Sequence, residues 1–380
     1  MPTMAITTIK RDGDGNPIRA KYRIVALGNL DPHQWTNEDC FAPVLSQLEL
    51  RFLVSLAVQN KCIPKTGDVQ QAFCQSKLPD NETYICTPPA GCPLTPKGFY
   101  LKLKKTLYGL KRSPRHFYDL AKKTLEDIGF IQHPSSPCLF IGHLIPNEPP
   151  IYLGLYVDDF IYFSKNRLVE EKFEKDFGSK MDTDFNGQIG HFLGVSFQCT
   201  THKNNDVSIL MSQEAFVDEL VNMADLDNDD ISIPRTPYRH GYPVDKIATI
   251  AADKANPSYV KYMQKFVGCL NWLSISTRPD ISTITNMIAK YTVIPTKGHI
   301  DAVKRVIKYL KGTKTKGILF STAPTTKISA YVKFPIPTNE VVSLCDANWA
   351  PKINLHQSLN MHHNSYHYSN HDRYQDTYYG

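Results

Sequence analysis

The feature that most constrains the fold is an apolar and aromatic run at residues 151–163 with two adjacent carboxylates near its centre. Its β-branched and aromatic residues favour a strand. Asp158 and Asp159 are the only charges in the run, and burying an ionised carboxylate costs several kcal/mol unless it is neutralised. We therefore expect a hairpin with strands at 154–157 and 160–163 and the acids at its tip, where a divalent cation can reach their oxygens. The alternative is a solvated turn between two core strands.

Length and composition indicate a protein with a substantial core. The chain has 380 residues, 42% of them apolar, which suits about two to three domains. No apolar run reaches the roughly 18 residues of a membrane span, and the first ten residues lack the pattern of a secretion signal. Nine scattered cysteines without a Cys-x-x-Cys pair indicate neither a zinc site nor a disulfide framework. We expect an intracellular, cytoplasmic chain with no membrane partner.

The net charge of +6 is modest, but basic residues are concentrated in two runs. Residues 97–123 hold nine Lys or Arg against Asp119, and residues 297–316 hold seven against Asp301. Aromatic residues interleave with the first run, a combination that suits a phosphate backbone with stacked bases. The alternative for each run is an ordinary solvated face.

The N-terminal part of the chain offers further candidate residues. Residues 1–18 are polar and are expected to form a tail or a tight turn. Lys21 and Arg23 fall on one face of the strand that follows, because strand side chains alternate. Two such cations suit a triphosphate, and a solvated strand face is the alternative. Asp68 ends a short segment, either as a third acid for the hairpin tip or as a turn residue.

Helical periodicity predicts several helices. One spans 46–59, with a Ser46–Glu49 capping box and an inward face of Leu48, Phe52, Leu53, Leu56 and Ala57. Another begins with Ser113 as N-cap and Pro114 at N1 and stops at Gly129. Further helices are expected at 211–223, 259–276 and 299–311. In the last, Lys304, Arg305, Lys308 and Lys311 are expected to project outward.

Other patterns complete the outline. Residues 190–197 are expected to form a strand pair and 341–349 a strand, and residues 218–250 contain an acidic, Pro-rich linker. The last thirty residues have no apolar period and are expected to be disordered. Their histidines are irregularly spaced, which argues against a metal site.

Seven motifs, in order, resemble the reverse transcriptase of copia-type LTR retrotransposons over residues 21–350. They are Lys-x-Arg-Ile-Val-Ala at 21–26, Cys-Phe-Ala-Pro-Val at 40–44, Asp-Val-Gln-Gln-Ala-Phe at 68–73, Leu-Tyr-Gly-Leu-Lys-Arg-Ser-Pro-Arg at 107–115, Tyr-Val-Asp-Asp at 156–159, Phe-Leu-Gly-Val at 192–195, and Thr-Arg-Pro-Asp-Ile at 277–281 with Tyr-Leu-Lys-Gly-Thr at 309–313.

The resemblance implies an α+β right-hand polymerase with fingers, a palm built on an antiparallel sheet, and a thumb. It makes Asp68, Asp158 and Asp159 the catalytic, metal-binding triad for two Mg²⁺ ions about 3.5 to 4 Å apart, with Mn²⁺ as an alternative. The implied partners are an RNA or DNA template with its primer, and deoxynucleoside triphosphates. It leaves the oligomeric state open, and members of the family assemble in virus-like particles.

Further roles follow only from the resemblance. Phe73 matches a position whose ring excludes a 2′-hydroxyl. Lys21 and Arg23 match cations that bind the triphosphate. Tyr108 and Lys111 match a turn beside the nucleotide and template, and residues 192–194 match a loop that holds the primer end.

The chain also departs from the family pattern. Leu27 stands where arginine is common, Arg112 where glutamine is usual, and Ser136 where aspartate is frequent. Residues 345–350 resemble the entry strand of an RNase H domain, with Asp346 as its first acid, but the following residues do not resemble that domain. We therefore expect no RNase H activity.

The expected division is a tail at 1–18, fingers and palm at 19–205, thumb and linker at 206–250, a helical connection region at 251–325, and a truncated RNase H start with a tail at 326–380. The expected function is RNA-directed DNA polymerase. The alternative is a catalytically dead, truncated retroelement remnant that at most binds nucleic acid. A nucleotide cyclase or another palm enzyme would leave the basic motifs unexplained.

Overall fold

The computed structural model describes residues 1–11, 17–92, 98–228, 232–238 and 255–322. These residues combine helices with antiparallel sheets, which confirms the predicted α+β class. The strand predicted at 341–349 and the histidine-rich tail lie outside the described residues. Among the helices of the described ranges, none is long and apolar enough to cross a membrane.

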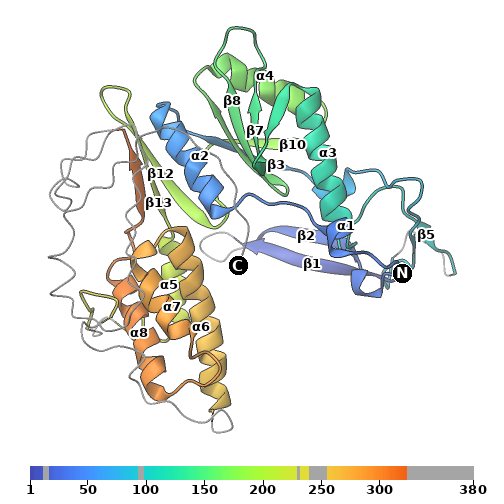
Figure 1. Cartoon of the computed structure of the whole chain (residues 1–380). Coiled ribbons are helices and arrows are strands. Elements are labelled where there is room, and N and C mark those ends of the chain that lie inside the picture. The colour runs from blue at the N-terminus through green and yellow to red at the C-terminus, as the bar shows by residue number, and fades with distance from the viewer. Residues whose placement is uncertain (12–16, 93–97, 229–231, 239–254, 323–380) are drawn as a thin grey trace, which may run out of the picture. The chain divides into compact units, whose positions relative to one another are not determined.

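A six-stranded antiparallel sheet, which we call the central sheet, carries the hairpin (Figure 1). Its strands follow the order β10-β3-β9-β8-β7-β6. Their bounds are β3 Lys65–Val69, β6 Phe130–His133, β7 Ser136–Gly142, β8 Ile151–Tyr156, β9 Asp159–Ser164 and β10 Thr183–Gln188. The sheet therefore places β3, from early in the chain, between β9 and β10.

The apolar run at 151–163 forms the predicted hairpin. Tyr156 on β8 pairs with Asp159 on β9, so Val157 and Asp158 form a two-residue turn. Val157 has a φ of 53°, a left-handed conformation that short hairpin turns favour. Both strands extend further from the tip than predicted, and the prediction of a hairpin with the acids at its tip is confirmed.

Alternate side chains of β9 enter separate cores on the two faces of the central sheet. Phe160 and Tyr162 belong to one core, and Ile161 and Phe163 belong to the other. The helices that pack on the sheet are α2 Gln47–Gln59, α3 Ser113–Asp127 and α4 Arg167–Gly178 (Figure 1). Side chains of α3 and α4 join the core of Phe160, whereas α2 joins that of Ile161.

Helix α2 shows how the sheet selects a helix face. A Cβ on Gly154 of β8 would lie 2.4 Å from Cδ1 of Leu53, so the glycine allows α2 to approach closely. The buried residues of α2 are Leu50, Leu53, Val54, Ala57 and Val58. Leu48 and Phe52 are instead 72% and 55% exposed, so their predicted inward orientation was wrong. The apolar residues of this helix span more than one face, and contact with β8 decides which face is buried.

Helix termini partly follow the sequence signals. The capping box of Ser46 and Glu49 is present at α2. The Ser113 hydroxyl, predicted to cap α3, instead donates to the Leu107 carbonyl at 2.7 Å, so that prediction was wrong. Gly129 follows α3 with a φ of 103°, as its predicted stop position requires.

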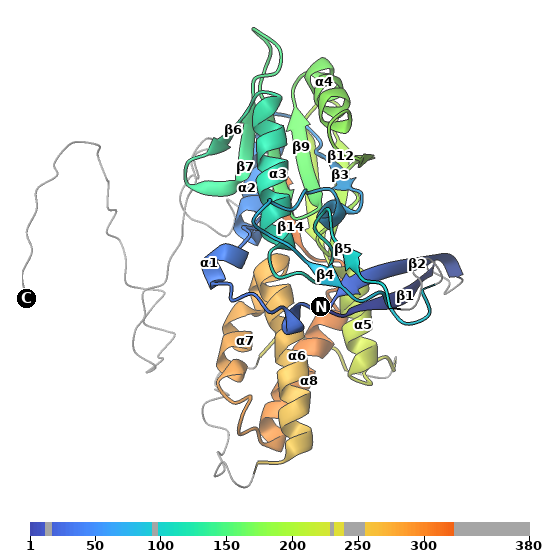
Figure 2. The same cartoon turned by 90° about the vertical axis from the view of Figure 1, so that its right-hand side faces the viewer.

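Residues 3–11 form a strand, which corrects the predicted tail. β1 Thr3–Arg11 pairs with β2 Pro17–Ala26 in a two-stranded ribbon, seen in Figure 2. The β-branched residues of β1 favour this pairing. β2 carries Lys21 and Arg23 at alternate positions, opposite Thr8 and Ile6.

The remaining strands form two smaller sheets. One has the order β11-β12-β13-β14, with bounds β11 His191–Phe192, β12 Val195–Thr201, β13 Val207–Ser212 and β14 Ile318–Ser321. The other pairs β4 Ile85–Cys86 with β5 Leu101–Lys102. Short helices are η1 Gly28–Leu30, α1 Asn37–Cys40 and η2 Ala72–Cys74. The strand pair predicted at 190–197 is confirmed by β11 and β12.

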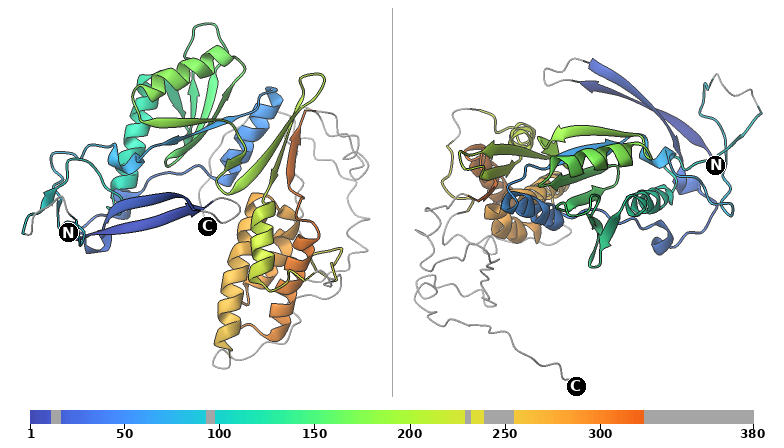
Figure 3. Two further views of the ribbon diagram at one scale, coloured as in Figure 1. Left: turned by 180° about the vertical axis from the view of Figure 1, so that it is seen from behind. Right: turned by 90° about the horizontal axis from the view of Figure 1, so that it is seen from above.

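A group of helices follows β13 and shares one hydrophobic core. Its members are α5 Glu214–Met223, α6 Pro257–Ser276, η5 Pro279–Ile281, α7 Ser282–Ala289 and α8 Lys297–Lys311. Figures 2 and 3 show α6 beside α7 and α8. The predicted helices at 259–276 and 299–311 are confirmed. The one predicted at 211–223 begins at Glu214, because Met211 and Ser212 belong to β13.

Candidate active site at the hairpin tip

Three aspartates occupy one register row of the central sheet. Asp68 on β3 lies directly opposite Asp159 on β9 and, on its other side, directly opposite Asp184 on β10. Side chains at paired positions of neighbouring strands point to the same face. Asp158 lies in the adjoining turn, and its carbonyl accepts a hydrogen bond from the Val69 amide at 2.8 Å. The structure thus brings together all three predicted acids and adds Asp184.

Aromatic packing supports this row from the opposite face. Gly67 lies opposite Phe160, and a Cβ on Gly67 would lie 2.2 Å from the Phe160 ring. That ring packs edge-on against Phe173, Phe177 and Phe185. Gly67 immediately precedes Asp68, and Phe160 immediately follows Asp159. This aromatic core therefore fixes the backbone beneath both acids.

The three predicted acids repel one another electrostatically. The pKa of Asp159 is raised to about 6 by burial, and further by the negative charges of Asp158 and Asp68. Like charges within a few ångströms favour protonation of one member. A bound cation would remove this repulsion.

Carboxylate oxygens are the donor set that Mg²⁺ and Mn²⁺ prefer, so the residues at the hairpin tip fit such ions chemically. Within the described ranges, however, no group of three or more His, Cys, Asp or Glu side chains converges closely enough to hold a metal ion. Ion binding at this tip therefore requires the carboxylates of Asp68, Asp158 and Asp159 to come closer together.

Phe73, Tyr108 and Arg23 form a cluster beside the acids. The ring centroids of Phe73 and Tyr108 are 5.1 Å apart, and the Arg23 guanidinium lies 5.7 Å from the Tyr108 ring. The pKa of Tyr108 is raised by burial and by the negative charges of Asp158 and Asp68, which lie nearby. The structure therefore gathers predicted nucleotide-binding residues from three distant segments of the chain.

Two glycines bring β2 to the turn that carries Tyr108. A Cβ on Gly28 would lie 2.0 Å from the Gly109 carbonyl oxygen, and a Cβ on Gly109 would lie 2.0 Å from that of Ala26. The Ala26 amide donates to the Tyr108 carbonyl at 2.7 Å. Gly109 also has a φ of 91°, which a residue with a side chain rarely adopts. This contact sets the position of Arg23 relative to Tyr108.

Of the two basic residues that follow this turn, one is exposed and the other forms an ion pair with a buried carboxylate. Lys111 is exposed. Arg112 forms an ion pair with Glu82 and lies 4.7 Å from the Trp35 ring. Glu82 is 5% exposed and also contacts His116 at 3.1 Å. Arg112, a departure from the family pattern, therefore neutralises a buried carboxylate.

The predicted primer loop joins β11 to β12. Leu193 and Gly194 both have positive φ, 50° and 73°. The Gln213 side chain donates to the Gly194 carbonyl at 3.3 Å and accepts from the Thr277 hydroxyl at 2.8 Å. Gln213 thus links the motif at 277–281 to the loop that is expected to hold the primer end.

The two C-terminal motifs contact each other. Arg278 is 2% exposed, forms an ion pair with Asp280 at 2.8 Å and donates to the Thr313 carbonyl at 3.0 Å. The Tyr309 hydroxyl donates to Asp280 at 2.8 Å. Residues from 277–281 and 309–313 therefore form one hydrogen-bonded cluster with a structural role.

The second basic run does not present a uniform outward face. The Lys311 ammonium donates to the carbonyls of Leu226, Asp227 and Asn228. Arg305 donates to the Thr236 carbonyl at 3.1 Å. The predicted outward projection of Arg305 and Lys311 was wrong, because both hold backbone from the segment that precedes α6.

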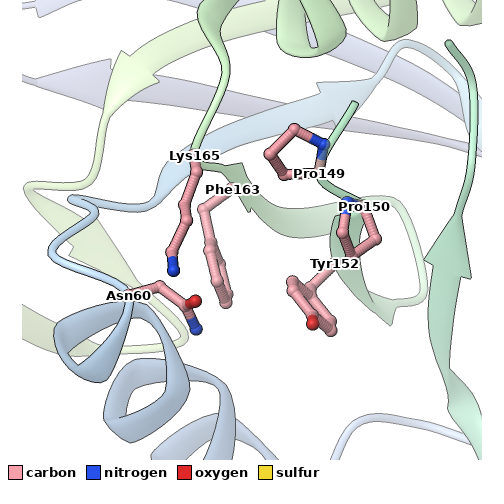
Figure 4. A pocket seen from close by; sticks show the side chains of 6 residues that line it. All are labelled: Asn60, Pro149, Pro150, Tyr152, Phe163 and Lys165. Atoms are coloured by element: carbon pink, nitrogen blue, oxygen red, sulfur yellow. The ribbon is translucent and has the colours of Figure 1, made fainter. Parts of the chain in front are cut away.

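A small pocket lies away from the acids. It is lined by Asn60, Pro149, Pro150, Tyr152, Phe163 and Lys165 (Figure 4). Tyr152 pairs with Phe163 across β8 and β9, and their rings stack with centroids 5.2 Å apart. Four residues of strand, about 13 Å, separate this pair from the hairpin tip. The pocket is therefore not part of the candidate site.

Comparison with known proteins adds independent evidence. Residues 1–237 match the family of reverse transcriptases (RNA-dependent DNA polymerases). The retrovirus-related Pol polyprotein from transposon RE1 of Arabidopsis thaliana is 27% identical over 347 residues, covering 91% of this chain and 22% of the polyprotein. The corresponding protein from transposon TNT 1-94 of Nicotiana tabacum is 27% identical over 307 residues, covering 80% of this chain and 22% of its own length.

The solved structure of the foamy viral protease-reverse transcriptase in complex with double-stranded DNA covers 82% of this chain and 44% of that chain, at 15% identity and a TM-score of 0.40. The chain spans about a fifth of the length of the retrotransposon polyproteins named above, 22% in each case. The family match covers more than half of the chain and includes all three acids of the hairpin-tip site. The predicted family is confirmed: this chain belongs to the reverse transcriptase (RNA-dependent DNA polymerase) family.

Proposed function

We propose that this chain extends a primer 3′-hydroxyl with deoxynucleotides on an RNA or DNA template, and that Asp68, Asp158 and Asp159 are its catalytic residues. The observation that carries the proposal is the cross-strand pairing of Asp68 with Asp159 beside Asp158 in the turn. Three acids in this arrangement suit two divalent ions. When bound, such ions activate the attacking oxygen and stabilise the leaving pyrophosphate.

The chain's own residues would orient the nucleotide. Arg23, together with Lys21 on the same strand, would bind the triphosphate, and the exposed Lys111 would contact the template side. The Phe73 ring, held between Tyr108 and Phe117, would lie against the sugar and exclude a 2′-hydroxyl. The positions of Arg23, Phe73 and Tyr108 beside the acids support the assignments of Arg23 and Phe73.

The pairing of β1 with β2 moves the first boundary of the proposed division of the chain. Since β1 pairs with β2, we assign residues 1–205 to fingers and palm. Residues 206–250 would form the thumb and linker, and 251–325 the helical connection region. The proposed RNase H start at 326–380 lies outside the described residues.

A second candidate function is nucleic-acid binding without catalysis. It is favoured by one observation, namely that acid side chains of the described residues do not converge as a metal site. The basic, aromatic run at 97–123 suits nucleic-acid binding whether or not the chain is a polymerase.

Two assays on the full chain separate these functions. Fluorescence anisotropy measures binding of a primed RNA duplex, and gel analysis measures primer extension with deoxynucleotides in Mg²⁺, in Mn²⁺ and in EDTA. Extension that requires the metal supports the polymerase. Binding without extension in either metal would contradict it and establish the second function.

A further inference from the structure

Gln70 joins two carboxylates in the acid row. Its side-chain amide donates to Oδ2 of Asp68 at 3.0 Å and to Oδ2 of Asp184 at 2.5 Å. A neutral amide group has two N–H donors, so one group serves both acids. Neither Gln70 nor Asp184 was predicted as a site residue.

The backbone of Gln70 is fixed to the start of β10. Its amide donates to the Asp182 carbonyl at 2.8 Å, and its carbonyl accepts from the Gln75 side chain at 2.6 Å. Gln75 also donates to the Asp182 carbonyl at 3.1 Å and accepts from the Asp182 amide at 3.3 Å. Gln71 has a φ of 48°, which turns the chain between these contacts. Gln70 is therefore a rigid donor rather than a mobile surface amide.

We infer that Gln70 and Asp184 are positioning residues that hold the Asp68 carboxylate in a fixed rotation for a divalent cation. The inference rests on the proposed function. Binding one oxygen of Asp68 sets where its other oxygen meets the cation, and hydrogen bonds to a charged acceptor are stronger than those between neutral groups. Asp184, in turn, holds the second N–H of Gln70 and so fixes the amide plane.

The register separates the role of Asp184 from that of the triad. Asp184 lies one strand beyond Asp68 and two strands from Asp159. Neighbouring strands are about 4.8 Å apart, so Asp184 is roughly 10 Å across the sheet from Asp159. An ion shared by Asp68, Asp158 and Asp159 would lie on the side of Asp68 that faces away from Asp184. Asp184 therefore acts through Gln70 and not as a further ligand.

The test compares Gln70→Ala and Asp184→Ala with Gln188→Ala. Gln188 is an exposed residue of the same strand as Asp184 and serves as the control. Mn²⁺ binding to the protein without nucleic acid is measured by electron paramagnetic resonance, and the Mg²⁺ dependence of primer extension is measured separately. We expect both site variants to weaken Mn²⁺ binding and to raise the half-activating Mg²⁺ concentration by about 10-fold. Their kcat at saturating Mg²⁺ should stay within about threefold of the parent.

Conservative variants test positioning against simple loss of structure. Asp184→Asn keeps an acceptor oxygen for Gln70 and is expected to restore most of the metal affinity lost in Asp184→Ala. If Gln70→Ala unfolds, Asp184→Ala carries the same test, because it leaves the backbone contacts of Gln70 in place. The inference is overturned if the site variants match Gln188→Ala in both assays while the parent is active. A parent that neither binds Mn²⁺ nor extends primer overturns the proposed function and the inference together.

Discussion

Asp68 and Asp159 are direct cross-strand neighbours on β3 and β9, far apart in the sequence and on the same face of the central sheet. Like charges directly opposite each other destabilise a sheet. Burial and the charges of Asp158 and Asp68 raise the pKa of Asp159 to about 6. The site is therefore expected to reduce the stability of the metal-free protein.

Because the charged form of Asp159 destabilises the folded state, Asp159→Asn is expected to stabilise the protein in a pH-dependent way. The folded-state pKa is about 6 and the unfolded value is 3.8, so the folded state is favoured by protonation below pH 3.8 and loses that advantage as the pH rises through 6. In EDTA at pH 7.5, we expect the variant to gain about 1 to 3 kcal/mol in the free energy of unfolding, measured with urea.

The gain should shrink toward zero at pH 3.5. Asp176→Asn on α4, where the acid bonds to Lys172 on the surface, is the control and should change stability by less than about 0.5 kcal/mol. A gain that is the same at both pH values would contradict the electrostatic explanation.

Gly67→Ala should destabilise the fold by overpacking. The new Cβ would lie 2.2 Å from the Phe160 ring, which is itself enclosed by other aromatic rings. We expect a loss of about 1 to 3 kcal/mol in urea unfolding. Gly190→Ala, where the added Cβ meets no atom within 4 Å, is the matched control. Equal effects of the two substitutions would show that the ring has room to move.

Phe73→Val should relax selection against ribonucleotides. The ring packs on Tyr108 and Phe117 and is proposed to lie against the sugar. Removing it should raise the relative kcat/KM for ribonucleotides over deoxynucleotides by about 10-fold or more. Phe99→Val replaces a ring that is 65% exposed and should leave this ratio unchanged. A ratio unchanged in both variants would remove Phe73 from the sugar site.

Asp280→Ala should destabilise the helical group. Arg278 is buried, and without Asp280 it loses its ion-pair partner and keeps the Thr313 hydrogen bonds and the contact with the Tyr309 ring. Burial raises the pKa of Asp280, but bonds from Arg278 and Tyr309 outweigh it and hold that pKa below its usual value. Because Asp280 is partly exposed, we expect a loss of about 2 to 3 kcal/mol. Glu171→Ala breaks an exposed pair with Arg167 and should cost less than about 1 kcal/mol; equal losses would contradict the buried-pair account.

The hairpin and its acids were predictable because two charges interrupt an otherwise apolar run. Asp68 was assigned to the same site by resemblance, whereas its pairing with Asp159 depends on long-range strand register. Asp184 and Gln70 were missed for that reason. No local pattern indicates that β10 lies beside β3, and an amide in a loop carries no signal of its partner.

The inward face of α2 shows a second limit of sequence reasoning. Leu48 and Phe52 fit a helical stripe as well as Leu50 and Val54 do, and contact with Gly154 on β8 decides between them. The basic residues of α8 show a third limit. Lys311 resembles a phosphate-binding lysine in sequence, but its ammonium binds backbone carbonyls in the structure.

The most direct test of the central claim is primer extension on poly(rA)/oligo(dT) with Mg²⁺, comparing the parent with Asp158→Asn and with the surface variant Asp176→Asn. If the hairpin tip is the metal-dependent polymerase site, the parent and Asp176→Asn extend the primer and Asp158→Asn loses at least about 100-fold in rate. Extension by Asp158→Asn at the parental rate would contradict the claim that this turn holds the catalytic acids.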